Sequence, residues 1–128
     1  MTRREYIRLW LVKASHDLRI TRQGMDRTAE EWVTDMLAFH ALQAIEKSLK
    51  AYLILLEEEP ARTHSLEVLL DTIHDKDPTF PRYDFGRLTD YAVQHRYPDD
   101  LTEPSTVETE QFIDLAEQVY ECVMVRVE

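Results

Sequence analysis

The sequence predicts an all-α protein, an up-and-down bundle of four or five helices. Its 128 residues include only two glycines and five prolines, too few for the frequent turns of an all-β sandwich or barrel. The prolines divide the chain into stretches whose apolar residues recur at steps of three and four, as on one face of a helix. Short connections between these stretches favour antiparallel neighbours. The length matches a single domain, residues 1–128.

The first two predicted helices cover residues 4–23 and 29–58. The first has one apolar stripe, and Gly24 is placed to end it. Thr28 and Glu31 have the spacing of a capping box for the second. The second helix is apolar on so many sides that we expect it to be central, in contact with several neighbours.

Three further helices are predicted in the second half of the chain. A short one covers residues 65–74 and another residues 83–94, and a loop rich in Pro and Asp follows over residues 96–105. Ser105 and Glu108 form a second potential capping box, which begins a last helix over residues 107–127.

Charge and composition exclude several classes of protein. The net charge of −10 disfavours a stand-alone nucleic-acid binder, although residues 1–27 carry seven cations against three anions. That basic segment is either a solvated helix face or a surface for an acidic partner or a phosphate backbone. No apolar run is long enough to span a membrane. The single cysteine, Cys122, cannot form an intramolecular disulfide and fits a cytoplasmic protein.

The usual catalytic patterns are not found. The five histidines lie in separate contexts, and the one close pair, His64 and Glu67, would supply only two ligands, so no metal and no cofactor are expected. Cys122 lies beside the apolar face of the last helix, where packing is the usual role of a free cysteine. Gly24 and Gly86 are too far apart for a glycine-rich phosphate loop.

Two polar stretches are candidate binding sites. Gln43, Glu46 and Lys50 share one face of the most apolar helix, with Lys47 beside them. This face is either a salt-bridge ladder between helices or a polar strip for a ligand or subunit. If these charges lie near the centre of the bundle they need partners, which a second subunit could supply.

The second stretch, residues 91–99, gathers His95, Arg96 and Tyr97 at a helix end before Pro98. Arginine, tyrosine and histidine there could bind an anion, stack on a base and transfer a proton. Alternatively, they cap the helix, with the cations complementing its dipole.

Four motifs in order along residues 5–125 resemble the HEPN family, in its small prokaryotic form. They are Trp10/Ala14/Asp17/Leu18, Gln43/Glu46/Lys47/Lys50/Ala51, Thr63/His64/Leu66 and Arg96/Tyr97/Pro98/Asp99. The resemblance implies a helical bundle that pairs as a homodimer. It also implies a minimal nucleotidyltransferase as partner in a toxin–antitoxin-like system.

Other HEPN branches are metal-independent ribonucleases with an arginine four to six residues before a histidine. Here Arg87 is separated from His95 by seven residues, which is about 12 Å of rise on a continuous helix and too far for joint action on one phosphate. His95 and Tyr97 match the H-x-Y pattern of the branch whose partner modifies a tyrosine, but Asp90 occupies the place of the arginine that branch requires. Arg96 could substitute for it.

The sequence therefore favours a dimeric nucleotide-binding or regulatory module that is not itself an enzyme, with a metal-independent endoribonuclease as the alternative. In the first hypothesis Lys50 and Arg96 contact phosphate or an acidic partner, Tyr97 stacks, and Glu46 orients the cations. In the alternative, His95 is the general acid or base and Arg87 or Arg96 stabilises the transition state. The ligand is a nucleotide or RNA, and no membrane is involved. The expected binding residues are Gln43, Glu46, Lys47, Lys50, His95, Arg96 and Tyr97.

Overall fold

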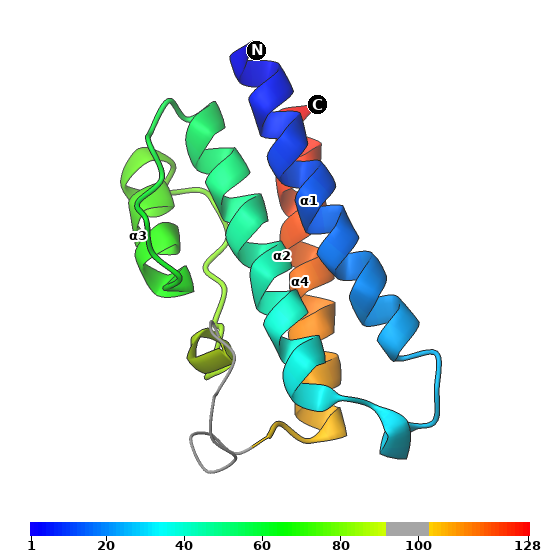
Figure 1. The fold of residues 1–128 in the computed structure, drawn as a ribbon. Helices are drawn as coiled ribbons and strands as arrows, with labels where there is room; N and C mark the ends of the chain where they lie inside the picture. The colour runs from blue at the N-terminus through cyan, green and yellow to red at the C-terminus, as the bar shows by residue number, and fades with distance from the viewer. Residues whose placement is uncertain (92–102) are drawn as a thin grey trace.

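A computed structural model describes residues 1–91 and 103–128 of the chain. In these residues all regular structure is helical, which confirms the all-α prediction (Figure 1). None of the described helices has the length and apolar character needed to cross a bilayer. The elements are α1 (Arg3–Gly24), η1 (Ala29–Glu31), α2 (Thr34–Leu55), α3 (Leu66–Lys76), η2 (Leu88–Tyr91) and α4 (Thr106–Val127).

Helix α1 begins at a capping box and ends where α2 comes close. Thr2 is the N-cap: its hydroxyl accepts from the Glu5 amide at 3.1 Å, and the Glu5 carboxylate accepts from the Thr2 amide at 2.8 Å. Gly24 is the last helical residue, as expected. A Cβ there would overlap the buried side chain of Leu37, so this glycine also permits the close approach of α1 and α2.

Helix α2 is shorter at both ends than the predicted range of 29–58. The capping box expected at its start is wrong, because the Thr28 hydroxyl donates to the Glu31 side chain and precedes only the single turn η1. At the other end the Glu58 amide donates to the carbonyl of Leu53 and the Glu57 amide to that of Ile54. Glu57 has a φ of 63°. This is a Schellman motif with glutamate at the left-handed position, which ends the helix.

The two shorter predicted helices have different outcomes. Helix α3 is confirmed, with the Ser65 hydroxyl accepting from the Val68 amide as its N-cap. The helix predicted over residues 83–94 is wrong for residues 83–87. The Asp84 side chain accepts from the Gly86 amide at 2.9 Å, and Gly86 has a φ of 54°, so helical structure begins only at Leu88, as the turn η2. Residues 92–94 lie outside the described part.

Helix α4 begins one residue before the predicted range. The Ser105 hydroxyl accepts from the Glu108 amide at 3.0 Å, which is half of the expected capping box. The Glu108 carboxylate accepts from Arg87 instead of from the Ser105 amide.

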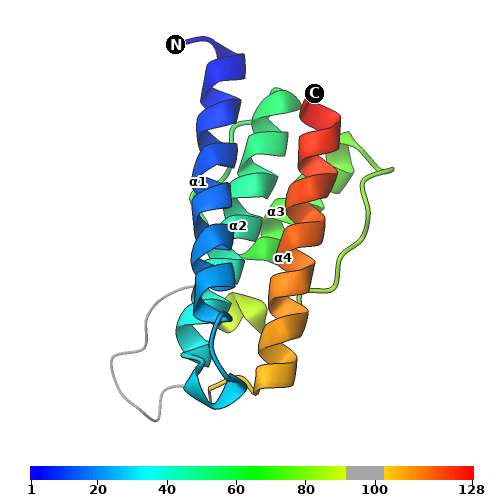
Figure 2. The same ribbon diagram turned by 90° about the vertical axis from the view of Figure 1, so that its right-hand side faces the viewer.

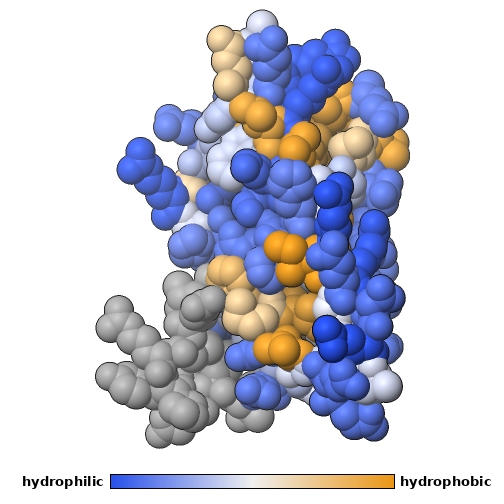
Figure 3. Space-filling view, turned by 45° about the vertical axis from the view of Figure 1, so that its right-hand side comes forward, coloured by the Kyte–Doolittle hydropathy of each residue, from blue (hydrophilic) through white to orange (hydrophobic). Residues whose placement is uncertain are grey.

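Helix α2 is the central element, as its apolar circumference predicts. It packs against both α1 and α4 (Figures 1 and 2), and its side chains of Leu42, Ile45, Leu49 and Leu53 are fully buried. Helices α1 and α2 are antiparallel, whereas α4 runs in the same direction as α2, because α3 and η2 lie on the chain that returns between them. The face shown in Figure 3 is mostly hydrophilic, and its apolar side chains form separate clusters.

Candidate functional site

The candidate site is a polar strip on α2, made of Gln43, Glu46, Lys47 and Lys50. Gln43, Lys47 and Lys50 are half-buried, and Glu46 is only 5% exposed. A glutamate this deeply buried keeps its charge only if nearby groups pair with it. The structure provides those partners in two clusters, one for each half of the strip.

The first cluster is centred on Glu46. Its Oε2 accepts from Lys50 Nζ at 3.1 Å, one helical turn along, and its Oε1 lies 2.9 Å from His64 Nδ1. His64 precedes the N-cap residue Ser65, so the beginning of α3 fixes the position of the imidazole beside α2. The sequence paired His64 with Glu67, but its partner in the structure is Glu46.

The second cluster is centred on Asp17, which is 6% exposed. Lys47 Nζ donates to its Oδ2 at 2.6 Å, and His40 Nδ1 lies 2.8 Å from its Oδ1. Burial alone would raise the pKa of Asp17, but the hydrogen bonds and charges of His40 and Lys47 outweigh burial and lower the pKa below its ordinary value. Asp17 therefore stays ionised and joins α1 to α2.

These clusters change one argument made from the sequence. Both lysines of the strip have their carboxylate partners in the same chain: Asp17 for Lys47 and Glu46 for Lys50. A second subunit is therefore not needed to neutralise them. The salt-bridge ladder and the polar strip are also no longer alternatives, since the ion pairs join α1, α2 and the segment before α3 while Lys47 and Lys50 stay partly accessible.

Sequence reasoning did not include Trp10 among the site residues, although it lies at one end of the strip. Lys50 Nζ is 5.7 Å from the centre of the Trp10 ring, which packs edge-on against Tyr6. The indole N–H is buried and has no acceptor among the described residues. A pocket of about 520 Å³ adjoins Tyr6, Trp10 and Lys50 and is bordered by the acidic residues 57–59. The spacing of Tyr6 and Trp10, one turn apart on α1, is the sequence signal for this aromatic pair.

Sequence reasoning also missed the pairing of His40 with Asp17. His40 seemed isolated in the sequence, and Asp17 was noted only as part of a motif. An aspartate among the apolar positions of a helix is a signal for a buried ion pair, because such a charge needs a partner. The identity of that partner depends on the packing of α1 against α2.

Arg87, one of the candidate catalytic cations, has partners of its own. Its Nε and Nη2 donate to the two carboxylate oxygens of Glu108, each at 3.1 Å, and Nη2 also donates to the Tyr91 hydroxyl at 2.7 Å. The bidentate pair joins the segment before η2 to the first turn of α4. Arg87 thus has a structural role in the described part of the chain.

The remaining candidates, His95, Arg96 and Tyr97, lie outside the described residues, so their expected roles stay predictions. Within residues 1–91 and 103–128, no group of three His, Cys, Asp or Glu side chains is arranged to hold a metal ion. Cys122 is half-buried on α4, and Arg126 Nη1 donates to its Sγ at 3.0 Å.

Comparison with known proteins gives one match. The model of the HEPN domain family matches residues 7–126, which is nearly the whole chain and includes both clusters and Arg87. Comparisons with curated proteins and with solved structures found no match.

Proposed function

Because this chain belongs to the HEPN domain family, we propose that it is a binding and regulatory module and not a nuclease. We further propose that it acts as a homodimer together with a minimal nucleotidyltransferase, in a toxin–antitoxin-like pair. The ligand class we assign to it is a nucleotide.

We favour a binding module over a nuclease because of one observation. Three cations that could stabilise a cleaving phosphate, Lys47, Lys50 and Arg87, each have a carboxylate partner within 3.1 Å. A transition-state stabiliser must direct its charge at the reacting group. Cations that are already paired instead provide a rigid, nearly neutral surface, which favours recognition over catalysis.

The pocket beside Trp10 supports a nucleotide as the ligand. It combines an aromatic pair, Tyr6 and Trp10, with the ammonium group of Lys50. Aromatic rings stack on bases. Lys50 uses one of its three N–H groups on Glu46, so another can donate to a bound phosphate even though its charge is largely neutralised. The same pocket is bordered by the acidic residues 57–59 and by Arg3 and Arg62. With Lys50 these charges balance, so the pocket lacks the basic surface that an RNA backbone needs, and we expect mononucleotides to bind better than RNA.

The nucleotide hypothesis can be tested by fluorescence. The chain has two tryptophans, so a Trp32→Phe variant leaves Trp10 as the only indole reporter. Titration of this variant with ATP, GTP and AMP is expected to change Trp10 emission with saturation, and Lys50→Met in the same background should weaken the response. No saturable change up to millimolar nucleotide, with the melting temperature also unaffected, would refute nucleotide binding.

The homodimer is supported by the exposed side of α2. Met36, Phe39 and Ile54 lie along the same side as the polar strip, at helical spacing, and all are half-buried. Methionine and phenylalanine are enriched at interfaces between protein subunits relative to the rest of the surface, so Met36 and Phe39 support a subunit contact on this side of α2. Light scattering at micromolar concentration should give about twice the 15.2 kDa mass of the chain, and Phe39→Glu should give the monomer. A wild-type monomer would refute the dimer.

The partner can be tested by co-purification with the product of a neighbouring nucleotidyltransferase gene. We expect the pair to elute together and the Arg96→Ala/Tyr97→Ala variant to lose the partner. A matched variant, Arg19→Ala on the exposed side of α1, should retain it. Equal retention by the wild type and both variants would remove Arg96 and Tyr97 from the interface, and no co-elution of the wild type would refute the pairing.

The alternative, RNA cleavage, would use His95 as the general acid or base and Arg87 or Arg96 to stabilise the transition state. It predicts growth arrest on expression without the partner, relieved by His95→Ala. Equal growth of the two strains and no RNA turnover in vitro would remove it.

A further inference from the structure

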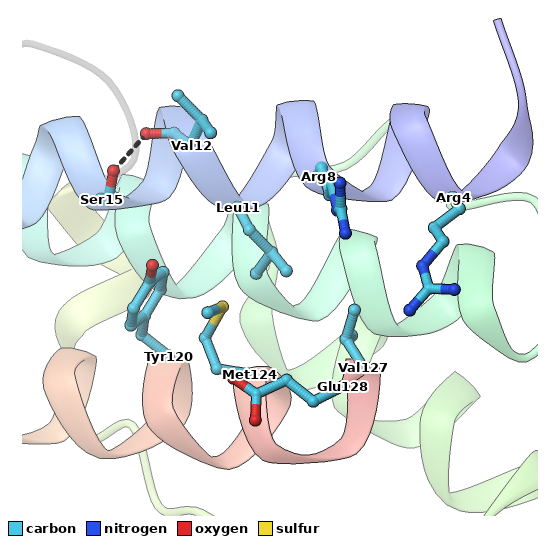
Figure 4. A pocket seen from close by; sticks show the side chains of 9 residues that line it. All are labelled: Arg4, Arg8, Leu11, Val12, Ser15, Tyr120, Met124, Val127 and Glu128. Atoms are coloured by element: carbon cyan, nitrogen blue, oxygen red, sulfur yellow. Dashed lines mark hydrogen bonds between the residues drawn. The ribbon is translucent and has the colours of Figure 1, made fainter.

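A groove runs between α1 and α4, on the opposite flank of α1 from Trp10. It has a volume of about 460 Å³, within the range of sites for small ligands. Figure 2 shows the two helices side by side with α2 behind them. Figure 4 shows the side chains of both helices that line the groove. None of these residues belongs to the polar strip.

The polar and apolar groups of the groove are separated along its length (Figure 4). Arg4 and Arg8 lie at the end where α1 begins. The middle is formed by Leu11 of α1 and by Met124 and Val127 of α4. These side chains are apolar, and the exposed side chain of Glu128 places its carboxylate at their edge, beside Met124.

The far end of the groove contains the half-buried side chains of Ser15 and Tyr120. The Ser15 hydroxyl donates to the carbonyl of Val12 at 2.6 Å, so its hydrogen is already used. Burial raises the pKa of Tyr120, with the charge of Glu121 adding to the effect, so the phenol stays neutral at physiological pH. This end therefore carries no charge.

The two arginines give the groove its charge. Neither Arg4 nor Arg8 forms an ion pair with any residue in the described part of the chain. Glu128 also lines the groove, and its carboxylate lies beside Met124 and away from Arg4 (Figure 4). No ion pair joins it to either arginine within the described residues. Two guanidinium groups beside an apolar channel attract an anionic group that is attached to an apolar one, because carboxylates and phosphates match the geometry of guanidinium.

We infer that this groove binds a single-chain amphiphile with an anionic head. The head, a carboxylate or a phosphate, contacts Arg4 and Arg8, and the acyl tail lies along Leu11 and Met124 toward Tyr120. Arg4 and Ser15 are separated by about 16 Å of helix rise, roughly the length of an extended chain of twelve carbons. A partner helix fits less well, because its diameter with side chains is about 10–12 Å and its charged residues would lie along the whole groove.

The test is calorimetric titration of the full chain, below the critical micelle concentration, with decanoate, decyl phosphate and 1-decanol. We expect decanoate and decyl phosphate to bind with 1:1 stoichiometry and 1-decanol to bind at least about tenfold more weakly, since it lacks the charged head. The stronger of the two anions identifies the head group. Arg4→Gln/Arg8→Gln should weaken both anions at least about tenfold without affecting 1-decanol.

Two valines provide a matched pair of variants that test where the apolar tail binds. Val12 lines the groove and is 47% exposed, whereas Val125 is 69% exposed and lies outside it on α4. Both are exposed enough to accept glutamate without disturbing the core. Val12→Glu should weaken decanoate binding, because it adds a negative charge at the exposed edge of the groove (Figure 4), and Val125→Glu should not change it.

Four results would overturn the inference. The first two are that 1-decanol binds as tightly as decanoate and that acetate or inorganic phosphate competes as well as decanoate. The third is that Val12→Glu and Val125→Glu weaken decanoate binding to the same extent. The fourth is that Val12→Glu changes the particle mass measured by light scattering. The last would assign the groove to contact between copies of the chain. Because the groove shares no residue with the nucleotide pocket, failure here leaves the nucleotide titration unaffected.

Discussion

Replacing Asp17 by Asn is the most direct test of how α1 is held to α2. The side chain keeps its size, but it loses the charge that accepts from Lys47 at 2.6 Å and that faces His40 at 2.8 Å. An amide can present one oxygen to one of these donors, and its NH2 group then faces the other. If the oxygen accepts from Lys47, the NH2 group can donate to His40 Nδ1 in the tautomer in which that nitrogen is an acceptor. The loss then comes from the missing negative charge opposite the Lys47 ammonium group.

The loss of stability expected for Asp17→Asn follows from how deeply Asp17 and its two partners are buried. Asp17 is 6% exposed as a residue, and the side chains of Lys47 and His40 are 24% and 21% exposed. Breaking a fully buried ion pair costs about 3–5 kcal/mol. The partial exposure of both donors lets water replace some of the lost interaction, so we expect about 2–3 kcal/mol. For a chain of this length that is a decrease of roughly 10 °C in melting temperature.

The effect should depend on pH in a definite direction. The folded pKa of Asp17 is lower than its unfolded value, so its contribution to stability is fully present above the unfolded pKa of about 3.9 and is lost as pH falls through the folded pKa. The gap between wild type and Asp17→Asn should therefore be constant near neutral pH. It should close as the solution is made acidic, because the wild-type carboxyl is then also neutral.

The measurement is urea unfolding at pH 7 and at a series of lower pH values. Asp71→Asn, on the exposed surface of α3, is the matched control and should change stability by less than about 0.5 kcal/mol. A loss at pH 7 no larger than that of the control, or a gap that widens on acidification, would refute the reasoning about Asp17.

Three further changes test other parts of the fold. Tyr52 donates to Asp77 at 2.6 Å, and burial, together with the hydrogen bond to Asp77 and its charge, raises the pKa of Tyr52 to about 12. In urea unfolding at alkaline pH, the stability of the wild type should therefore fall between about pH 10 and 12, and that of Tyr52→Phe should fall less. Arg87→Gln should cost about 1 kcal/mol in chemical denaturation, because its bidentate pair with Glu108 is partly exposed, and an unchanged midpoint would contradict the pairing. Glu57→Gly should stabilise the fold by about 1 kcal/mol and so raise the melting temperature, since glycine adopts a φ of 63° without strain. A lower melting temperature would count against the Schellman motif.

Local chemistry made two helix starts predictable, but the same kind of signal at Thr28 and Glu31 does not begin α2. The Ser65 and Ser105 caps have side chains that accept from backbone amides a few residues ahead, so their effect can be read from a short window of sequence. The end of α2 could not be read in this way. The Schellman motif there has Glu57 where glycine is usual, and only the backbone conformation reveals it.

The strip on α2 was predictable as a set of residues but not as a set of interactions. Helical spacing places Glu46 and Lys50 together, and this pair is confirmed. The pairing of Lys47 with Asp17 joins residues 30 positions apart. It depends on how α1 crosses α2, which no local pattern specifies.

The shared direction of α2 and α4 has a consequence for how the chain folds. The antiparallel pair α1 and α2 needs only residues 25–33 to close its loop, whereas α2 and α4 meet after residues 56–105 have looped back. Closing the longer loop costs roughly 1.5 kcal/mol more chain entropy. The hairpin of α1 and α2 should therefore form first and offer its apolar side as the template on which α4 docks. Loss of Asp17 would then slow folding, while changes in α4 would mainly speed unfolding.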